Sequence, residues 1–305
     1  MENKRLGYIY ITAATLCFCL TEITLKTVAG VFNPIQINIM RFLFGGLVLL
    51  PFVLGKIRRD GIHFSAGDLR RFALSGFLQI CVAMTLYQIA LKHVEASACA
   101  LIFSINPLFI LVLAYLFLGE PITKKNVTAL ALEIVGILFV INVFAADLDL
   151  AETVFAVAAP LFFSVYAVMG REPARKYGGM TNTCMSFLFG ACELIIFALF
   201  TNVPAIGNAF SSVGLSMFDS IPFIKGLDTR TIPIVLLNGL VLTGGGFTSY
   251  FKAMENVSVN TVSLVYFFKP ILTPILALIL LAEPLTMTKT VGILFILAGS
   301  LVNML

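Results

Sequence analysis

The chain has 305 residues, of which 59% are hydrophobic and 12% charged, and its mean hydropathy is +1.01. A soluble domain carries about 25% charged residues, so this composition excludes an ordinary water-soluble protein and indicates an integral membrane protein. The net charge of +4 comes from basic residues in short loops and therefore does not indicate binding to nucleic acid.

Apolar runs long enough to cross a hydrocarbon core of about 30 Å recur along the whole chain. They predict an all-α membrane fold of ten transmembrane helices, over Leu6–Val28, Asn33–Leu54, Phe72–Leu91, Ala96–Leu118, Asn126–Phe144, Ala151–Gly170, Thr181–Phe200, Thr231–Lys252, Val259–Leu281 and Met287–Met304. The first run lacks a small-residue cleavage site, so we expect it to be a helix and not a signal peptide. Only loop 201–230 is long, and its composition predicts an extramembrane segment with one short surface helix.

Lysines and arginines are distributed unequally between the loops on the two sides of the predicted bundle. Thirteen lie on the side that holds both termini, and five lie on the other side. Cytoplasmic loops carry the excess of Lys and Arg, so we expect a multi-pass protein of the cell membrane with both termini in the cytoplasm. Loop 145–150 carries Asp147 and Asp149 and no base, as expected for the outer side.

The second half of the sequence repeats the first. At a constant offset of 163 positions, the following residues align: Tyr87 with Tyr250, Asn106-Pro107 with Lys269-Pro270, Glu120-Pro121 with Glu283-Pro284, and Gly136 with Gly299. An earlier stretch, Phe42–Gly45, matches Phe187–Gly190 at an offset of 145. The alignment predicts two five-helix repeats, over residues 1–146 and 147–305, with loop 201–230 on the extracytoplasmic side. Because five is odd, the repeats are inverted in the membrane, an arrangement that suits alternating access.

With this duplication the chain resembles the EamA-like transporters of the drug/metabolite transporter superfamily over essentially its whole length. The matching features are the two Glu-Pro pairs with Lys26, Asn33-Pro34, Arg41–Gly46, Gly136, Gly292 and Gly299. The resemblance implies a central cavity lined by helices 1, 3, 4, 6, 8 and 9, and export or exchange of small metabolites. The sequence departs from the usual pattern at Phe18-Cys19, where many members have Trp-Gly, and at Ala129. Substrates vary widely in this family, so the resemblance implies no particular one.

Lys269 is the strongest candidate for a functional residue. A charge at membrane depth costs several kcal/mol, so it is usually paired or faces a cavity. Pro270 and Pro274 follow it and free backbone carbonyls that need other partners. We interpret Lys269, with Asn106 at the matching position, as a central substrate site that offers a positive charge to a carboxylate or phosphate. The alternative is an ion pair buried for folding.

Hydroxyl and amide side chains on the expected cavity helices extend this site. The candidates for substrate binding are Tyr87, Tyr250, Tyr266, Tyr166, Gln79 and Asn238. Any one of them is more often an interhelical hydrogen bond than a ligand contact, but together they indicate a polar, aromatic-lined cavity.

Glu22 lies in the first predicted helix, and two bases are within its reach. Lys26 is four positions later on the same helix, where side chains meet. Glu22 lies about 9 Å below the outer end of the first helix, and Arg41 lies about 12 Å below the outer start of the second. The two side chains could therefore pair at a similar depth in the membrane. Glu22 is therefore either a proton carrier gated by substrate or one arm of a fixed pair with Lys26 or Arg41. For Arg41 itself, a structural link between helices 1 and 2 is favoured.

Four other acids are given other roles. We expect Glu133 to be neutral and hydrogen-bonded or to lie at a dimer contact, and Glu193 to be a weaker candidate for proton coupling. Glu120 and Glu283 precede prolines at the membrane faces, which favours capping or gating over substrate binding. The six cysteines lie inside apolar runs and predict small buried side chains, without a disulfide framework or metal site.

The sequence thus predicts a secondary active transporter, an exporter or exchanger, of an amino acid or another small compound bearing a carboxylate or phosphate. The alternative is a proton-coupled exporter of cationic drug-like compounds that uses Glu22. Motifs for nucleotide binding, zinc proteases and serine hydrolases are absent from the sequence, so we expect no enzyme activity and no cofactor. The expected partners are a small-molecule substrate and the lipid bilayer, with the chain as a monomer or homodimer.

Overall fold

The computed structural model of the chain describes residues 4–119, 121–142, 150–212, 214–257, 259–262 and 264–304, and the regular elements within these ranges are helices. Two features of the sequence lie outside the described residues. One is Glu120, and the other is the stretch 143–149, which holds the expected repeat boundary and the two aspartates of the predicted outer loop.

Helices account for each of the ten predicted spans. In chain order they are α1 Lys4–Val28, α2 Pro34–Asp60, α3 Ala66–Gly76, η1 Phe77–Met84, α4 Thr85–His93, α5 Ala96–Phe103, α6 Asn106–Leu118, α7 Lys124–Ile141, α8 Leu150–Met169, α9 Arg171–Tyr177, α10 Gly179–Thr201, α11 Pro204–Ser212, η2 Ser216–Phe218, α12 Thr231–Leu236, η3 Leu237–Gly245, α13 Gly246–Asn256, α14 Val259–Val262, α15 Leu264–Leu281 and α16 Met287–Met304. The third predicted span consists of α3, η1 and α4, and the eighth consists of α12, η3 and α13. The fourth span is also divided, into α5 and α6, and α14 and α15 are the described parts of the ninth.

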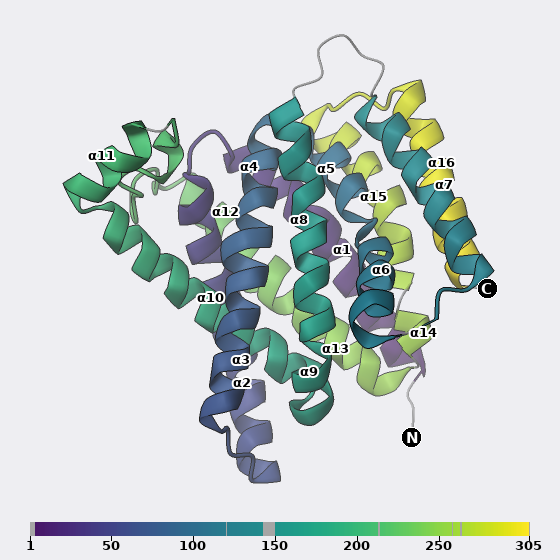
Figure 1. Cartoon of the computed structure of the whole chain (residues 1–305), viewed down its shortest axis with the longest axis horizontal. Helices are drawn as coiled ribbons and strands as arrows, with labels where there is room; N and C mark the ends of the chain where they lie inside the picture. Colours follow the sequence, from purple (N-terminus) through teal and green to yellow (C-terminus); the bar gives the residue numbers. More distant parts are fainter. Residues whose placement is uncertain are drawn as a thin grey trace.

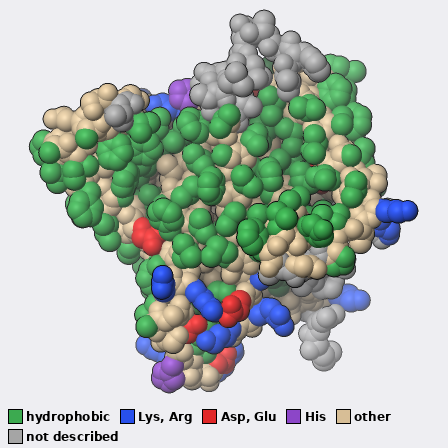
Figure 2. All heavy atoms as spheres, in the orientation of Figure 1, with side chains coloured by type: hydrophobic (Ala, Val, Ile, Leu, Met, Phe, Trp, Pro, Cys, Tyr) green, Lys and Arg blue, Asp and Glu red, His purple; other side chains and the backbone are tan. Residues whose placement is uncertain are grey.

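Most of these helices suit a bilayer. Among the described residues, seven helical stretches are long and apolar enough to cross a membrane, and α8 with α9 makes an eighth if the 45° bend between them is allowed. In α16 the apolar part is shorter, and α7 is less apolar because it carries Lys124, Lys125 and Glu133. Figure 2 shows hydrophobic side chains over most of one broad face, with charged side chains gathered below it. The chain is thus an all-helical integral membrane protein.

Helix boundaries repeat along the chain with the offset found in the sequence. α7 spans residues 124–141 and α16 spans 287–304, so both bounds differ by 163. The two halves also touch through equivalent residues, because the rings of Phe42 on α2 and Phe187 on α10 lie 4.9 Å apart. The fold is therefore a duplicated helical bundle.

Glycines allow α7 and α16, the last helices of the two halves, to pack closely. The two helices lie side by side at one edge of the bundle (Figure 1). A Cβ atom on Gly136 would lie 2.8 Å from the carbonyl oxygen of Gly292, and one on Gly292 would lie 2.6 Å from that of Gly136. Helices in membranes associate through small residues that let backbones approach, so these glycines set the contact.

Two π-helical segments, which the sequence did not predict, interrupt equivalent spans. η1 lies in the third span and η3 in the eighth, and they contain the buried amides Gln79 and Asn238 respectively. The glycines 244–246 at the end of η3 do not break the helix. They provide close packing, since a Cβ atom on Gly244 would lie 2.6 Å from the Cβ atom of Val48.

Loop 201–230 contains the predicted short helix, α11, and packs over the start of α2. Asn33 caps α2 by accepting a hydrogen bond from the backbone N–H of Ile35, and its amide donates to the carbonyl of Met217 in the loop. At the far end of the loop, Asp228 accepts hydrogen bonds from the backbone N–H groups of Thr231 and Arg230 before α12. These bonds hold the pKa of Asp228 below its ordinary value.

Replacing Gly136 by Ala should destabilise the α7–α16 pair, because the added Cβ meets a backbone carbonyl that has no room to move. Overpacking of this kind costs about 1–3 kcal/mol. The measurement is the thermal unfolding midpoint of the purified protein in detergent. The control is Gly55→Ala on α2, where a Cβ would meet nothing within 4 Å. At such a site Ala is favoured over Gly by about 0.5–1 kcal/mol. A Gly136→Ala midpoint equal to or above that of Gly55→Ala would contradict this account of the contact.

Candidate functional site

A cavity of about 310 Å³ lies inside the bundle between the two halves. Its walls come from α1, α2, η1, α4, the α5–α6 region, α8, α13 and α15. These include all six spans that the family resemblance assigns to the cavity, and α2 is added through Arg41. Its volume falls at the lower end of the range for ligand pockets, about 300–1,000 Å³.

The central contact of the cavity is an ion pair between the halves. Lys269 Nζ on α15 lies 2.6 Å from Glu22 Oε1 on α1, and the two side chains are 12% and 6% exposed. The second carboxylate oxygen, Glu22 Oε2, is buried and has no hydrogen-bond partner. An acceptor held beside the cavity without a partner is suited to receive a donor from a ligand.

Arg41 supplies a second cation to the cavity wall. Its Nε donates to Thr243 Oγ1 at 3.0 Å, and its guanidinium carbon lies 4.6 Å from the ring centroid of Phe42. The Glu22 carboxylate acts electrostatically on Arg41, but its ion-pair partner is Lys269. Among the lining residues there are thus two cations, Lys269 and Arg41, and one carboxylate, so the cavity carries a positive surplus.

Asn106, the repeat mate of Lys269, also lines the cavity. Its Oδ1 accepts a hydrogen bond from Ser164 Oγ on α8 at 3.2 Å, which leaves the amide N–H₂ as a donor. On the opposite half, Lys269 Nζ lies 5.7 Å from the ring centroid of Phe103. Asn106 and Lys269 therefore present a neutral hydrogen-bond donor and a cation, respectively, to the same cavity.

Aromatic side chains form much of the remaining wall. Tyr87, Tyr250 and Tyr266 all line the cavity, and the rings of Tyr250 and Tyr266 lie 5.8 Å apart. The hydroxyl of Tyr87 is buried without a hydrogen-bond partner, so it is available to a ligand. Sequence reasoning missed four phenylalanines of the wall, because Phe in an apolar helix looks the same whether it faces lipid or a cavity: Phe18, Phe103, Phe163 and Phe247.

Three of the residues predicted to bind substrate do not line the cavity. Gln79 and Tyr166 are buried outside the cavity wall, and the Tyr166 ring packs 5.4 Å from the ring of Phe163, which lines the cavity. Asn238 ties η3 to α1, since its Nδ2 donates to Thr24 Oγ1 at 2.6 Å and to the carbonyl of Thr21 at 3.3 Å. The structure thus gives Asn238 the interhelical role that was the alternative to ligand binding.

Lys26 is also turned away from the cavity. Its Nζ donates to the carbonyls of Leu91 and Val94 at 2.8 and 2.6 Å, at the C-terminal end of α4. Carbonyls there lack helical partners, and a cation is favoured beside them. One of the two roles expected for Glu22 was a fixed pair with Lys26 or Arg41. That pairing is wrong, because the ion-pair partner of Glu22 is Lys269 on the other half.

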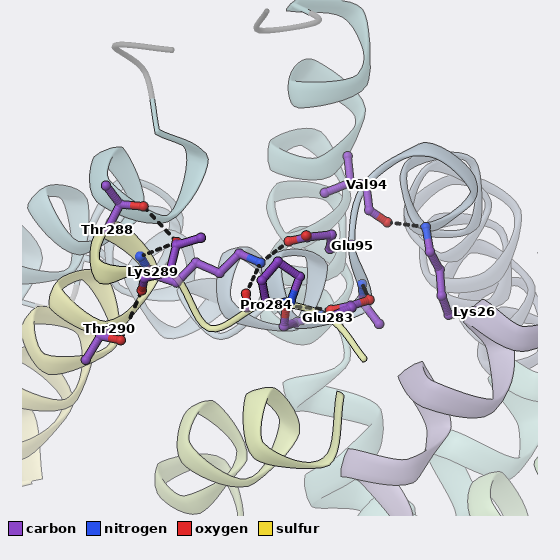
Figure 3. Close-up of polar contacts among 11 residues, drawn as sticks. Lys26, Val94, Glu95, Glu283, Pro284, Thr288, Lys289 and Thr290 are labelled. Atoms are coloured by element: carbon purple, nitrogen blue, oxygen red, sulfur yellow. Dashed lines mark hydrogen bonds and ion pairs between the residues drawn. The ribbon is translucent and has the colours of Figure 1, made fainter. Parts of the chain in front are cut away.

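A second polar network joins the halves at the end of the bundle near Lys26 (Figure 3). Glu283 accepts hydrogen bonds from the backbone N–H groups of Ala96 and Ser97 at 2.7 and 3.0 Å, and from Ser97 Oγ at 2.6 Å. It thereby caps α5 of the other half. Lys289 forms an ion pair with Glu95 and donates to the carbonyl of Pro284. We call these contacts of Glu283, Glu95 and Lys289 the outer network, because they lie at one end of the bundle and away from the cavity. They would have to break before the halves could separate at that end.

The remaining acids lie away from this site. Glu133 on α7 is buried and lies 3.4 Å from Ser300 Oγ on α16, and Glu193 on α10 accepts from Cys81 Sγ. In the part of the chain that the structure describes, no group of three or more His, Cys, Asp or Glu side chains is placed to hold a metal ion.

Comparison with known proteins finds a matching family, relatives of similar sequence and a solved structure of similar fold. The sequence model described as "EamA-like transporter family" matches residues 5–142 and 151–305, once for each half. An uncharacterized transporter of Clostridium kluyveri is 28% identical, over 97% of this chain and 92% of its own. A protein of Rickettsia bellii named S-adenosylmethionine uptake transporter is 25% identical, over 74% of this chain and 72% of its own. A solved crystal structure matches with a TM-score of 0.63 at 18% identity, over 98% of this chain and 95% of its own, which shows the shared fold.

The Glu22–Lys269 pair should behave as one unit in unfolding experiments. Removing one partner of a buried pair strands the other charge and costs about 3–5 kcal/mol, whereas removing both costs much less. We therefore expect Glu22→Gln and Lys269→Gln each to lower the thermal midpoint in detergent by more than the Glu22→Gln/Lys269→Gln double variant does. A double variant whose loss equals the sum of the two single losses would show that the charges are not coupled.

Proposed function

Because the chain belongs to the EamA-like transporter family, we propose that it is a secondary active transporter, an exporter or exchanger, of a small zwitterionic or anionic metabolite such as an amino acid. The observation that carries this proposal is the charge arrangement of the cavity. Lys269 and Arg41 face a single carboxylate, Glu22, between walls rich in Tyr and Phe. A cavity with surplus positive charge favours a substrate that brings a carboxylate or phosphate.

An amino acid would use both signs of charge in the cavity. Its carboxylate would accept hydrogen bonds from Lys269 and Arg41, and its ammonium group would donate to Glu22, whose Oε2 has no partner. The hydroxyl of Tyr87 and the amide of Asn106 would add neutral contacts. Charge-assisted hydrogen bonds of this kind are about twice as strong as neutral ones. The substrate would therefore replace one internal ion pair by two intermolecular ones.

The size of the cavity also favours a small substrate. A volume of about 310 Å³ corresponds to about ten water molecules in the liquid. The apolar part of the substrate would pack against the rings of Phe103, Phe163 and Phe247, which line the cavity.

Alternating access would follow from the two ties between the halves. The Glu22–Lys269 pair holds α1 to α15 at the cavity, and the outer network of Glu283, Glu95 and Lys289 holds the halves at one end. Inverted repeats can exchange conformations so that one site faces either side. A substrate whose carboxylate binds Lys269 would break the Glu22–Lys269 pair between the halves. Substrate binding would thereby be coupled to the movement of the halves that opens the outer network.

Export of cationic compounds with proton coupling is the alternative function. In its favour, Glu22 is the one acid among the residues that line the cavity. Against it, that carboxylate is already bound to Lys269, so a cationic substrate would strand the lysine and face Arg41 as well. The relative named for uptake of S-adenosylmethionine does not decide between the two substrate classes, because that compound carries both an amino-acid group and a sulfonium cation.

Replacing Lys269 by Gln should reduce transport of the substrate by proteoliposomes to the level of empty liposomes, because the carboxylate loses its charged partner. The control is Lys252→Gln, which removes an equal charge from a surface pair with Glu255 and should transport normally. Because Lys269→Gln strands Glu22, the Glu22→Gln/Lys269→Gln variant is measured beside it and should also be inactive. Full transport by either Lys269 variant would contradict the role of the lysine.

A further inference from the structure

The central cavity is lined by equivalent residues of the two halves. Of the sixteen described residues that line it, twelve form six pairs of repeat mates. Four pairs follow the offset of 163, as Tyr87 does with Tyr250. Two pairs, between α1 and α8, follow the offset of 145 that relates Phe42 to Phe187. The cavity therefore has two walls, and each residue of one wall has its mate in the other.

Each wall comes from one packed group of helices. α8 packs on η1, α4, α5 and α6, and its counterpart α1 packs on α13 and α15. The ring contacts also repeat. The rings of Tyr87 and Phe103 lie 5.2 Å apart in the first group, and the rings of their mates, Tyr250 and Tyr266, lie 5.8 Å apart in the second. The two walls thus resemble each other in their aromatic side chains.

The walls differ in charge. Glu22 and Lys269 both belong to the wall built on α1, which we call the charged wall. Their mates, Ala167 and Asn106, are uncharged and belong to the wall built on α8, which we call the neutral wall. The third charged residue that lines the cavity, Arg41, comes from α2. The charged side chains among the described lining residues therefore lie outside the neutral wall.

Ala167 leaves space in the neutral wall. Its mate Glu22 extends a long side chain to Lys269, whereas the side chain of Ala167 ends at its Cβ atom. One turn away on α8, the ring of Phe163 lies 5.1 Å from the ring of Phe103. The neutral wall thus offers two rings and the room that a longer side chain at position 167 would fill.

We propose that an amino-acid substrate lies across the cavity, with its charged groups on the charged wall and a large apolar side chain against the neutral wall. Ala167 is then the residue that determines how large a side chain is accepted. This inference rests on the proposed function and adds the class of side chain to it. A charged side chain would be stranded at the neutral wall, because no described residue of that wall carries an opposite charge.

The wild-type chain provides the first test. Binding of alanine, leucine, phenylalanine and lysine is measured from the concentration that half-saturates the rise in thermal midpoint of the purified full-length protein. We expect leucine and phenylalanine to bind about tenfold or more tightly than alanine, because added methylenes bury apolar surface in the pocket. We expect lysine to bind no more tightly than alanine.

Ala167→Leu fills the space in the neutral wall. It should weaken binding of leucine and phenylalanine by about tenfold or more and should leave binding of alanine within about twofold of wild type. Ala167→Val adds fewer atoms and should give a smaller loss in the same order. The matched control is Ala158→Leu, at a half-buried position of α8 that is not among the lining residues, and it should keep the wild-type preference.

Ala167→Glu copies the charge of the mate, Glu22, onto the neutral wall. It should reverse the preference, so that lysine binds more tightly than leucine, because the new carboxylate pairs with the side-chain ammonium. A purely structural role of Ala167 would weaken binding of all amino acids alike and would not produce this reversal.

The outcomes separate this inference from the proposed function. Equal binding of alanine and phenylalanine by the wild-type chain would overturn the inference and leave the proposed function in place. An equal loss for alanine and phenylalanine in Ala167→Leu would do the same. Stabilisation by none of the amino acids would contradict the proposed function itself.

Discussion

A pair of opposite charges buried between two halves of a membrane bundle is the constraint on which this structure depends. Neither Glu22 nor Lys269 is stable alone in a low-dielectric interior, so each requires the other half of the chain. Because the pair lines a cavity, its carboxylate and ammonium can also be shared with a ligand. The same interaction therefore holds α1 of one half to α15 of the other, and under the proposed function a charged substrate would release the halves by taking over one of the two charges.

The duplication explains why this constraint is placed at the centre. Equivalent residues of the halves meet close to their common axis, as the rings of Phe42 and Phe187 do, and the mates Asn106 and Lys269 share one cavity. Away from the centre the halves are joined by polar caps, of which Glu283 on the N-terminus of α5 is the clearest. At the periphery, glycines join α7 to α16. The Glu22–Lys269 contact at the cavity is charged, whereas α7 and α16 at the periphery are held by close packing.

The sequence predicted the helical membrane fold and its duplication, because hydropathy and a constant offset between repeats can be read directly from a sequence. It also singled out Lys269 as a charge at membrane depth, and the structure places that side chain at the central cavity, whereas its role in transport stays a prediction. It did not predict the partner of Glu22, since depth along a helix axis does not say which helix lies opposite. Gln79, Tyr166 and Asn238 were chosen for their chemistry, but they are not among the residues that line the cavity. Gln79 lies in η1 and Asn238 in η3, and nothing in the composition of these two π-helical segments predicts them.

Recognition of a carboxylate by the cavity is the central element of the proposed function. The most direct measurement is the thermal stabilisation of the purified wild-type chain by a panel of amino acids and by the amines that remain when each loses its carboxylate. We expect at least one amino acid to raise the unfolding midpoint in a concentration-dependent way, and we expect the corresponding amine to leave it unchanged. Equal stabilisation by the amine would contradict the account and favour a cation site at Glu22.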